Sequence, residues 1–387
     1  MTRRIKIIHV QLLPLMSGVQ KVSLDELARL DDACYERIGV CKCEGEFTEN
    51  LRRIGVRVHL VPELERAISP TRDTQAYRAL RDFFRKERPD IVHTHSSKPG
   101  VLGRLAARSA GVPLIVHTVH GFAFPSEPRK VVRSIFKVLE RLAGRVTDKM
   151  IVLNDTDATI ALDLGVPSSR QAVLPNGVDT DIYAPAEREH RLSLRKAAFG
   201  IDSPDHVALG RAARLWHQKN PQCFVRAAIE VARKRANASF FMIGDGELRG
   251  ELEATVQSSG HASRIRILGW RSDVPTLLKG LDIAVLPSRW EGMPLAILEA
   301  MSSAVPVIAS DIPGNHHLVR EGNDGRLFPL DDAEALVAAL IDLIDNPVKR
   351  ARLSAQARAK VVADYTLTAR MEKLKAIYQT VLHKPPE

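Results

Sequence analysis

The chain has 387 residues, of which 45% are hydrophobic and 26% are charged, and its formal net charge is +10. This length suits two α/β domains better than a single core, and the composition excludes an extended disordered chain. Basic residues interrupt every apolar run before it reaches the roughly 18 to 20 residues of a membrane span, which excludes an integral membrane protein. The apolar run Ile5 to Leu13 is interpreted as the first strand, because no cleavage site of small residues follows it.

The positive charge lies mainly in the first half, where residues 1 to 180 hold 28 Lys and Arg against 21 Asp and Glu. This excess predicts an anionic partner, such as nucleic acid, an acidic lipid surface or a phosphorylated substrate. The four cysteines, Cys34, Cys41, Cys43 and Cys223, form no paired pattern. We therefore predict neither a disulfide scaffold nor a zinc site, and we expect a reducing cytoplasm.

Short apolar, β-branched runs alternate with helical stretches in the first half, which predicts a parallel sheet flanked by helices. Ligands in open α/β sheets bind beyond the carboxyl ends of the strands, so His95, His120 and Asn154 fall in the right region for function. The expected strands are Ile5 to Leu12, Ile38 to Cys43, Val56 to Val61, Asp90 to His95, Pro113 to His120 and Lys149 to Leu153.

Turn and breaker residues over 174–179 and 183–185 predict a domain linker. A helical pattern begins at Asp331 and ends with one amphipathic helix over Thr366 to Leu382. We expect two tandem Rossmann-like α/β domains, 1–178 and 179–364, that face each other across a cleft, with 365–387 returning to the first domain. The expected strands of the second domain are His206 to Gly210, Ser239 to Ile243, Ile265 to Leu268, Ile283 to Pro287 and Val305 to Ser310.

The segment Arg289 to Met301 is the most informative part of the sequence. Pro294 suits the first turn of a helix, and the unbonded amides that follow it can bind phosphate. Glu291 and Glu299, eight positions apart, can accept hydrogen bonds from sugar hydroxyls. The alternative for this pair is a carboxylate at a helix start and a solvated helix glutamate.

A basic loop follows the strand that ends at Gly210. Arg214 offers a bidentate fork to phosphate and Lys219 offers a point charge, so together they can offset a diphosphate without a metal. Solvated surface residues are the alternative interpretation of this pair as well.

These segments resemble the C-terminal domain of the retaining family 4 glycosyltransferases, which have the GT-B fold. In the first half, 17–20 is similar to the glycine loop of that family and 175–179 to its linker. The resemblance covers most of the chain and extends to bacterial members that build polysaccharide and lipopolysaccharide. The matching segments of the second half are Arg214 to Lys219, Gly244-Asp245-Gly246, Pro287-Ser288 and Glu291 with Glu299.

The resemblance implies transfer of a sugar, with retention, from a nucleotide-diphosphate sugar to a glycan or lipid-linked acceptor, without a metal or other cofactor. By the same resemblance, Arg214 and Lys219 neutralise the leaving diphosphate. Glu291 contacts the sugar, Glu299 the ribose, and His120 lies against the donor sugar. Further donor contacts are implied for Gly18, Asp245, Trp270, Gly292, Met293, Pro294 and Leu295. Acceptor contacts are expected from Ser17, His95, Ser96 and Lys98.

The sequence departs from the common family pattern at Ser17, Ala213 and Asn220, where glycine is usual. The first change could narrow the phosphate loop, and the second leaves Arg211 as a substitute for Arg214. None of the three removes a charged group, so we expect the chemistry to be kept.

Residues 126–149 combine Arg and Lys with apolar side chains. A basic amphipathic helix can lie on an anionic membrane surface, although a packed helix with a solvated face gives the same pattern. The expected location is therefore the cytoplasm, at the inner face of the membrane. His93 and His95 could indicate a metal site. We expect them on opposite sides of the strand and see no carboxylate cluster nearby, so no metal is predicted.

Four other functions explain parts of the sequence but fit it less well. Asp155-Thr156-Asp157 resembles the metal site of manganese-dependent, single-domain transferases, but Asp155 also suits a helix cap. A sugar-nucleotide epimerase of the same fold would use the donor without an acceptor. A nucleic-acid-binding protein would explain the charge, but the sequence lacks an aromatic and basic platform. A dinucleotide-dependent oxidoreductase is disfavoured because no Gly-x-Gly-x-x-Gly follows the first strand.

Overall fold

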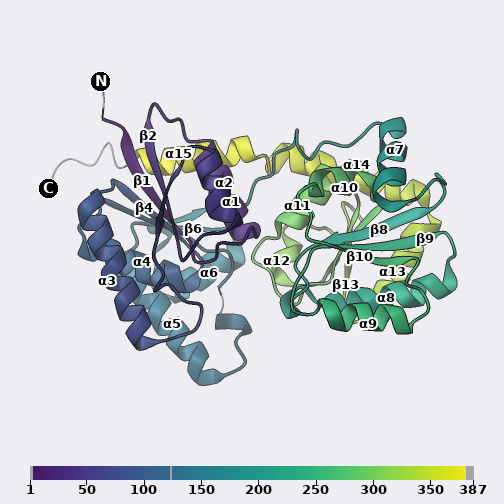
Figure 1. Ribbon diagram of the computed structural model, residues 1–387, viewed down its shortest axis with the longest axis horizontal. Helices are drawn as coiled ribbons and strands as arrows, with labels where there is room; N and C mark the ends of the chain where they lie inside the picture. Colours follow the sequence, from purple (N-terminus) through teal and green to yellow (C-terminus); the bar gives the residue numbers. More distant parts are fainter. Residues whose placement is uncertain (1–2, 123, 381–387) are drawn as a thin grey trace. The chain divides into compact units, whose positions relative to one another are not determined.

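The computed structural model describes residues 3–122 and 124–380. The chain divides into two compact units, the first made of 1–176 and 370–387 and the second of 177–369. Each unit holds one parallel sheet with helices on both faces (Figure 1). The boundary at Asn176 lies two residues before the one expected from the linker pattern, and the chain rejoins the first unit at Arg370.

The sheet of the first unit has the strand order β3-β2-β1-β4-β5-β6-β7. Its inner strands are rich in Ile and Val and are mostly buried, as parallel strands between helix layers must be, whereas the two edge strands are partly exposed. The order reverses between β1 and β4, which places a topological switch point at their carboxyl ends. The strands are β1 (Ile5–Val10), β2 (Tyr35–Cys41), β3 (Arg57–Leu60), β4 (Ile91–His95), β5 (Leu114–Thr118), β6 (Lys149–Val152) and β7 (Gln171–Val173). The helices are α1 (Gly18–Ala28), α2 (Glu46–Arg53), α3 (Pro70–Glu87), α4 (Ser97–Ser109), η1 (Phe124–Ser126), α5 (Lys130–Arg145), α6 (Asp155–Asp163) and η2 (Ser168–Arg170).

The sheet of the second unit has the order β10-β9-β8-β11-β12-β13, and its switch point lies between β8 and β11. Its strands are β8 (Val207–Ala212), β9 (Ala238–Ile243), β10 (Ile265–Gly269), β11 (Ile283–Leu286), β12 (Val307–Ser310) and β13 (Arg326–Phe328). The helices before β11 are α7 (Arg188–Phe199), η3 (His217–Lys219), α8 (Pro221–Lys234), α9 (Arg249–Ser258) and α10 (Val274–Gly280). Those after it are α11 (Leu295–Ser302), α12 (Pro313–His316), α13 (Ala333–Asp345), α14 (Pro347–Asp364) and α15 (Leu367–Gln379).

Two strands, β7 and β13, were not predicted from the sequence. Each has only three residues, which is too short for a period-two pattern to show, and each joins its sheet by pairing in parallel with β6 or β12. The last helix was predicted over 366–382, and it is observed as α15, while 381 and 382 lie outside the described residues. Among the residues that are described, no helix combines the length and apolarity needed to cross a membrane.

The end of the chain is tied into the first unit by a buried ion pair. Arg370 on α15 donates to Glu26 Oε1 at 2.7 Å, and both side chains are almost fully buried. The same guanidinium donates to the carbonyl oxygens of Leu174 at 2.8 Å and Pro175 at 2.6 Å. Since a buried charge left without its partner costs several kcal/mol, about 3 to 5 in comparable cases, Arg370 makes α15 an integral part of this unit.

Candidate functional site

Two loops that are far apart in sequence meet at the carboxyl edge of the second sheet. One follows β8 and contains Gln218, and the other follows β11 and contains Arg289 and Trp290. The backbone N–H of Arg289 donates to the carbonyl of Gln218 at 2.8 Å. The Gln218 side-chain amide donates to the carbonyl of Trp290 at 3.0 Å. The structure thus joins the two motifs that the sequence marked for a diphosphate and a sugar.

Lys219 and Glu291 form an ion pair at this junction. Lys219 Nζ lies 2.5 Å from Glu291 Oε1, and the two side chains are only 17% and 7% exposed. Gly314 of α12 packs against the same loop, because a Cβ at this position would lie 2.2 Å from the Glu291 carbonyl oxygen. The carboxylate is therefore held by its backbone as well as by the lysine.

The two arginines of the β8 loop have different surroundings. The guanidinium of Arg214 stacks over Trp216, with its carbon 3.7 Å from the ring centroid. Arg211, expected as a substitute for Arg214, is instead 1% exposed, and its guanidinium makes no hydrogen bond within the described residues. Burial lowers the pKa of Arg211 to about 10, and the nearby Glu291 charge partly opposes this shift. The expectation for Arg211 was wrong because a buried cation and a surface cation look the same in sequence.

The Gly244-Asp245-Gly246 loop packs directly against the loop that carries Arg214. Gly244 has φ of 142°, and a Cβ there would lie 2.2 Å from the Ala213 carbonyl oxygen. The backbone N–H of Leu215 donates to the carbonyl of Asp245 at 2.9 Å. A hydrogen bond from the Gly246 N–H, followed by Arg249, lowers the pKa of the Asp245 carboxyl. The indole of Trp270, which follows β10, is about half exposed.

Helix α11 begins one residue later than expected, at Leu295, with Pro294 as the residue before it. Gly292 and Met293 form the bend that leads from Glu291 into this helix. Glu299 is only 8% exposed, and its Oε1 accepts a hydrogen bond from the Tyr183 hydroxyl at 2.9 Å. The alternative of a solvated helix glutamate is therefore wrong for Glu299.

Two of the departures from the family pattern are explained by backbone geometry. Ser17 precedes α1 in an extended conformation, with φ of −130°, so no glycine is required there. Asn220 has φ of 46°, a left-handed conformation that asparagine tolerates better than most residues, and its amide donates to Asp331 at 2.8 Å. Position 17 does not need the freedom of glycine, and at position 220 asparagine can adopt the left-handed conformation in its place.

The acceptor-side residues occupy the switch point of the first unit. Gly18 begins α1, and the hydroxyl of Ser17, the residue before it, donates to the Gln20 side chain. Ser96 precedes α4 with φ of 63°. Lys98 Nζ lies 2.5 Å from Asp73, so its charge is already paired within the unit.

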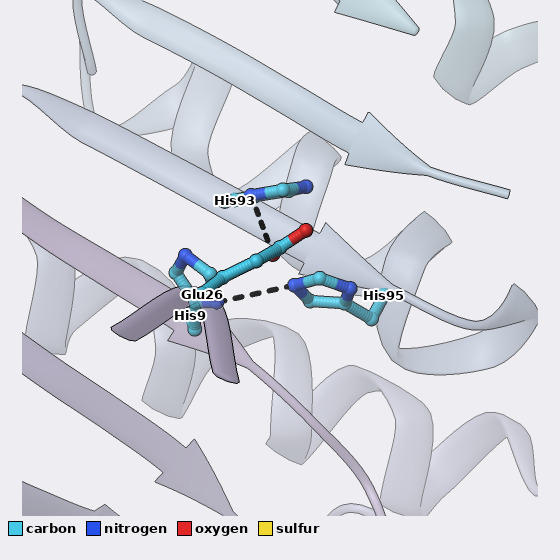
Figure 2. Close-up of side chains that lie close together, drawn as sticks. All are labelled: His9, Glu26, His93 and His95. Atoms are coloured by element: carbon cyan, nitrogen blue, oxygen red, sulfur yellow. Dashed lines mark hydrogen bonds and ion pairs between the residues drawn. The ribbon is translucent and has the colours of Figure 1, made fainter. Parts of the chain in front are cut away.

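A cluster of histidines lies inside the first unit. The rings of His93 and His95 are 4.3 Å apart on one side of β4 (Figure 2). The expectation that they face opposite sides was wrong, since side chains two positions apart on a strand share a face. Glu26 of α1 and His9 of β1 lie beside these two rings, so the cluster also contains a carboxylate. One donor atom from each of these four residues lies within 4.8 Å of the others.

His95 has no exposed surface, which argues against direct contact with an acceptor. Its two ring nitrogens bond instead to His9 at 3.2 Å and to His120 at 3.1 Å. His120 is only partly buried and lies beyond the end of β5. The structure therefore connects the expected sugar-contacting histidine to the interior of the unit.

The segment Asp155-Thr156-Asp157 forms the first turn of helix α6. Asn154, and not Asp155, is the cap of α6, and its side chain accepts from the Asp157 N–H at 2.8 Å. Asp155 is exposed, whereas Asp157 is buried and its pKa is raised to about 6 by burial. The two carboxylates do not share one environment, as a common metal ion would require.

Comparisons with known proteins agree with this geometry. The family description "Glycosyl transferase 4-like domain" matches residues 17–177, and "Glycosyl transferases group 1" matches 204–346. A UDP-Gal:alpha-D-GlcNAc-diphosphoundecaprenol alpha-1,3-galactosyltransferase of Escherichia coli is 42% identical over 97% of both chains. The chain belongs to the group 1, family 4-like glycosyltransferases. The lipopolysaccharide core mannosyltransferase LpsB of Rhizobium meliloti is 29% identical over 59% of this chain and 65% of its own.

Solved structures show the fold of this glycosyltransferase to be GT-B. Anabaena Alr3699/HepE in complex with UDP and glucose has a TM-score of 0.84 at 18% identity, covering 97% of this chain and all of that one. Sucrose-phosphate synthase of Thermosynechococcus elongatus has a TM-score of 0.80 at 17% identity, covering 98% and 99%. The predicted α/β class and the predicted nucleotide-sugar glycosyltransferase of surface polysaccharide synthesis are confirmed.

The buried histidines predict how the stability of this glycosyltransferase depends on pH. Burial lowers the pKa of His9 to about 3, whereas a histidine in an unfolded chain titrates near 6.5. Below about pH 6.5 the unfolded state binds more protons, so the free energy of unfolding should fall as pH decreases toward 3. Each such histidine contributes a slope of up to about 1.4 kcal/mol per pH unit.

Urea unfolding between pH 7.5 and 5 measures this dependence. His9→Asn should give a shallower slope than the wild type, and His190→Asn, which changes an exposed histidine on α7, should keep the wild-type slope. Equal slopes for all three proteins would contradict the prediction.

Proposed function

We propose that this glycosyltransferase transfers galactose, with retention, from UDP-galactose to N-acetylglucosamine on a diphosphate-linked lipid. The identity of 42% over almost the whole chain to an enzyme named for that reaction supports this choice of donor and acceptor. The donor part of this proposal rests on the junction between the loops that follow β8 and β11. It brings Lys219, Arg214 and Glu291 to one edge of the second sheet.

The donor diphosphate would exchange partners with the ion pair at this junction. A diphosphate is a stronger anion than one carboxylate, so it would attract Lys219 away from Glu291. Glu291 would then be able to accept a hydrogen bond from a sugar hydroxyl. Arg214 and the first amides of α11, at Leu295 and beyond, would stabilise the remaining negative charge. These groups replace the metal ion that other transferases use, and we propose that no metal is needed.

Retention would follow from attack on the face that the leaving group occupies. The acceptor hydroxyl oxygen forms the new bond to the anomeric carbon while the bond from that carbon to the diphosphate breaks. The acceptor proton passes to an oxygen of the leaving phosphate, so no side chain acts as a nucleophile. Gly18 would allow close approach of the donor at the start of α1, and Ser17 and Ser96 would face the acceptor beside the first turns of α1 and α4. The remaining positions proposed for donor binding are Asp245, Trp270, Gly292, Met293, Pro294 and Glu299.

The test of donor and acceptor uses a panel of sugars. UDP-galactose, UDP-glucose and GDP-mannose are each incubated with a synthetic N-acetylglucosamine diphospho-lipid in excess EDTA. We expect one disaccharide product, from UDP-galactose, with an α linkage by NMR. A strict requirement for added manganese would contradict metal independence. Release of an epimerised sugar without a disaccharide would replace transfer with epimerisation.

Substitutions at the ion pair test the donor site. Lys219→Ala and Glu291→Gln should each lower kcat by about 100-fold to 1000-fold, as loss of one group that stabilises developing charge does in other enzymes. Thermal unfolding should show that both proteins stay folded. Lys234→Ala and Glu334→Gln, on exposed positions of α8 and α13, should keep normal turnover. Near-normal rates in either junction variant would refute the assignment.

Helix α5 would hold the enzyme at the inner face of the cytoplasmic membrane. Four apolar side chains at helical spacing, Val131, Ile135, Val138 and Leu142, lie on one side of the helix and are 44% to 73% exposed. A row of basic residues runs beside them, namely Lys130, Arg133, Lys137 and Arg141. An amphipathic helix with exposed apolar and basic rows suits an anionic lipid surface, where a lipid-linked acceptor would be found.

Vesicle binding tests this orientation. Replacing Arg133, Lys137 and Arg141 by Glu should greatly weaken binding to phosphatidylglycerol vesicles, because each basic residue near such a surface contributes about 1 kcal/mol. The matched control reverses three exposed charges of α3 instead, Arg72, Arg78 and Lys86. Equal binding by the two triple variants would exclude α5 as the docking surface.

A further inference from the structure

A chain of buried hydrogen bonds leads from the last helix to His120. The Tyr378 hydroxyl of α15 lies 3.2 Å from His9 Nε2. His9 Nδ1 lies 3.2 Å from His95 Nε2, which the dashed line between the two rings marks in Figure 2, and the Ser23 hydroxyl lies 3.0 Å from the same His9 nitrogen. His95 Nδ1 lies 3.1 Å from His120 Nε2. Three hydrogen bonds therefore connect Tyr378 of α15 with His120, which follows β5.

The same hydroxyl continues the chain in the other direction. Tyr378 Oη lies 2.6 Å from His93 Nδ1, and His93 Nε2 lies 2.7 Å from Thr118 Oγ1. Burial lowers the pKa of His93 and His95 well below the ordinary value, so the rings are neutral. A neutral imidazole has one N–H donor and one acceptor nitrogen. Each ring that accepts at one nitrogen must therefore donate from the other, and the chain points in a single direction when the Tyr378 hydroxyl accepts from one ring and donates to the other.

Glu26 determines the direction in which the hydrogen bonds of this chain donate. Its Oε1 is held by Arg370 at 2.7 Å, while its Oε2 lies 4.0 Å from His93 Nδ1 and has no hydrogen-bond partner within the described residues. A carboxylate at this distance favours a hydrogen on the nitrogen that faces it. His93 then donates to the Tyr378 oxygen, Tyr378 to His9, His9 to His95, and His95 to His120 Nε2. His120 must carry its own hydrogen on Nδ1.

We propose that Tyr378, His9, His93 and His95 are positioning residues that fix His120 in the Nδ1–H tautomer. This N–H, on the ring edge away from His95, is then the donor offered to a hydroxyl of the donor sugar. The inference rests on the proposed contact between His120 and that sugar. The catalytic group is His120, and the four buried residues act only through it.

Histidine and glutamate side chains can bind zinc, and one donor atom from each of His9, Glu26, His93 and His95 lies within 4.8 Å of the others. Two observations favour hydrogen bonds over coordination. Both ring nitrogens of His93 already bond to Tyr378 and Thr118. Arg370 also places a positive charge beside Glu26, where a second cation would be repelled. A bound metal is therefore treated as an outcome that would overturn the proposal.

The tautomer of His120 can be observed directly. The protein is labelled with 15N at histidine, and the ring signals of His120 are assigned with His120→Gln. We expect a single Nδ1–H form in the wild type and a mixture of tautomers in Tyr378→Phe, which loses only the hydroxyl. The kcat of Tyr378→Phe should fall several-fold while the KM for the donor stays unchanged. Tyr77→Phe removes a hydroxyl from the Tyr77–Ser109 bond on the surface of the same unit and should match the wild type.

The possible results separate the tautomer proposal from the proposed function. An Nε2–H form of His120 in the wild type, or unchanged His120 signals in a folded Tyr378→Phe, would overturn the tautomer proposal. So would a stoichiometric metal in the purified protein that shifts the histidine signals when EDTA removes it. A changed tautomer with normal kcat would support the chain and refute the sugar contact. If Tyr378→Phe does not fold, Thr118→Val removes the hydroxyl at the far end and should shift the tautomer likewise.

Discussion

The ion pair between Lys219 and Glu291 is the interaction on which the donor site depends. Neither charge would be stable when mostly buried without the other, so the pair holds two loops together before any ligand arrives. Arg211 lies buried within reach of the same carboxylate charge and leaves the site with a surplus of positive charge. Such a site is ready to bind an anion, because a diphosphate would take the place of the Glu291 carboxylate as the partner of Lys219.

Glycine residues make this arrangement of loops possible. Gly244 and Gly246 leave no room for a side chain against Ala213, Leu215 and Trp216, and Gly314 leaves none against the Glu291 backbone. The loops that follow β8 and β9 can therefore approach each other through their backbones, and so can the segments that follow β11 and β12. Positioning by backbone contact is more rigid than positioning by long side chains, which suits a site that must hold charges at fixed places.

Much of the fold could be predicted from the sequence, because β-branched runs mark the strands and the parallel order places their ends at one edge. The same logic located the loops of Arg214, Lys219 and Glu291, since each follows such a run. The side chains inside the units could not be predicted in this way. The burial of Arg211, the bond from Tyr183 to Glu299 and the approach of Tyr378 to His9 depend on contacts between distant residues. Local periodicity carries no information about such contacts.

The return of the chain to the first unit has a consequence for its biosynthesis. The ribosome makes the seven strands of that unit before any part of the second unit, yet Arg370 and Tyr378 are made after the second unit. Until then Glu26 lacks its counter-ion, and the imidazoles of β1 and β4 lack their shared hydroxyl. Domains usually mature in the order in which they are translated. Here the second unit can complete its interior first, while the interior of the first unit stays incomplete until α15 has been made.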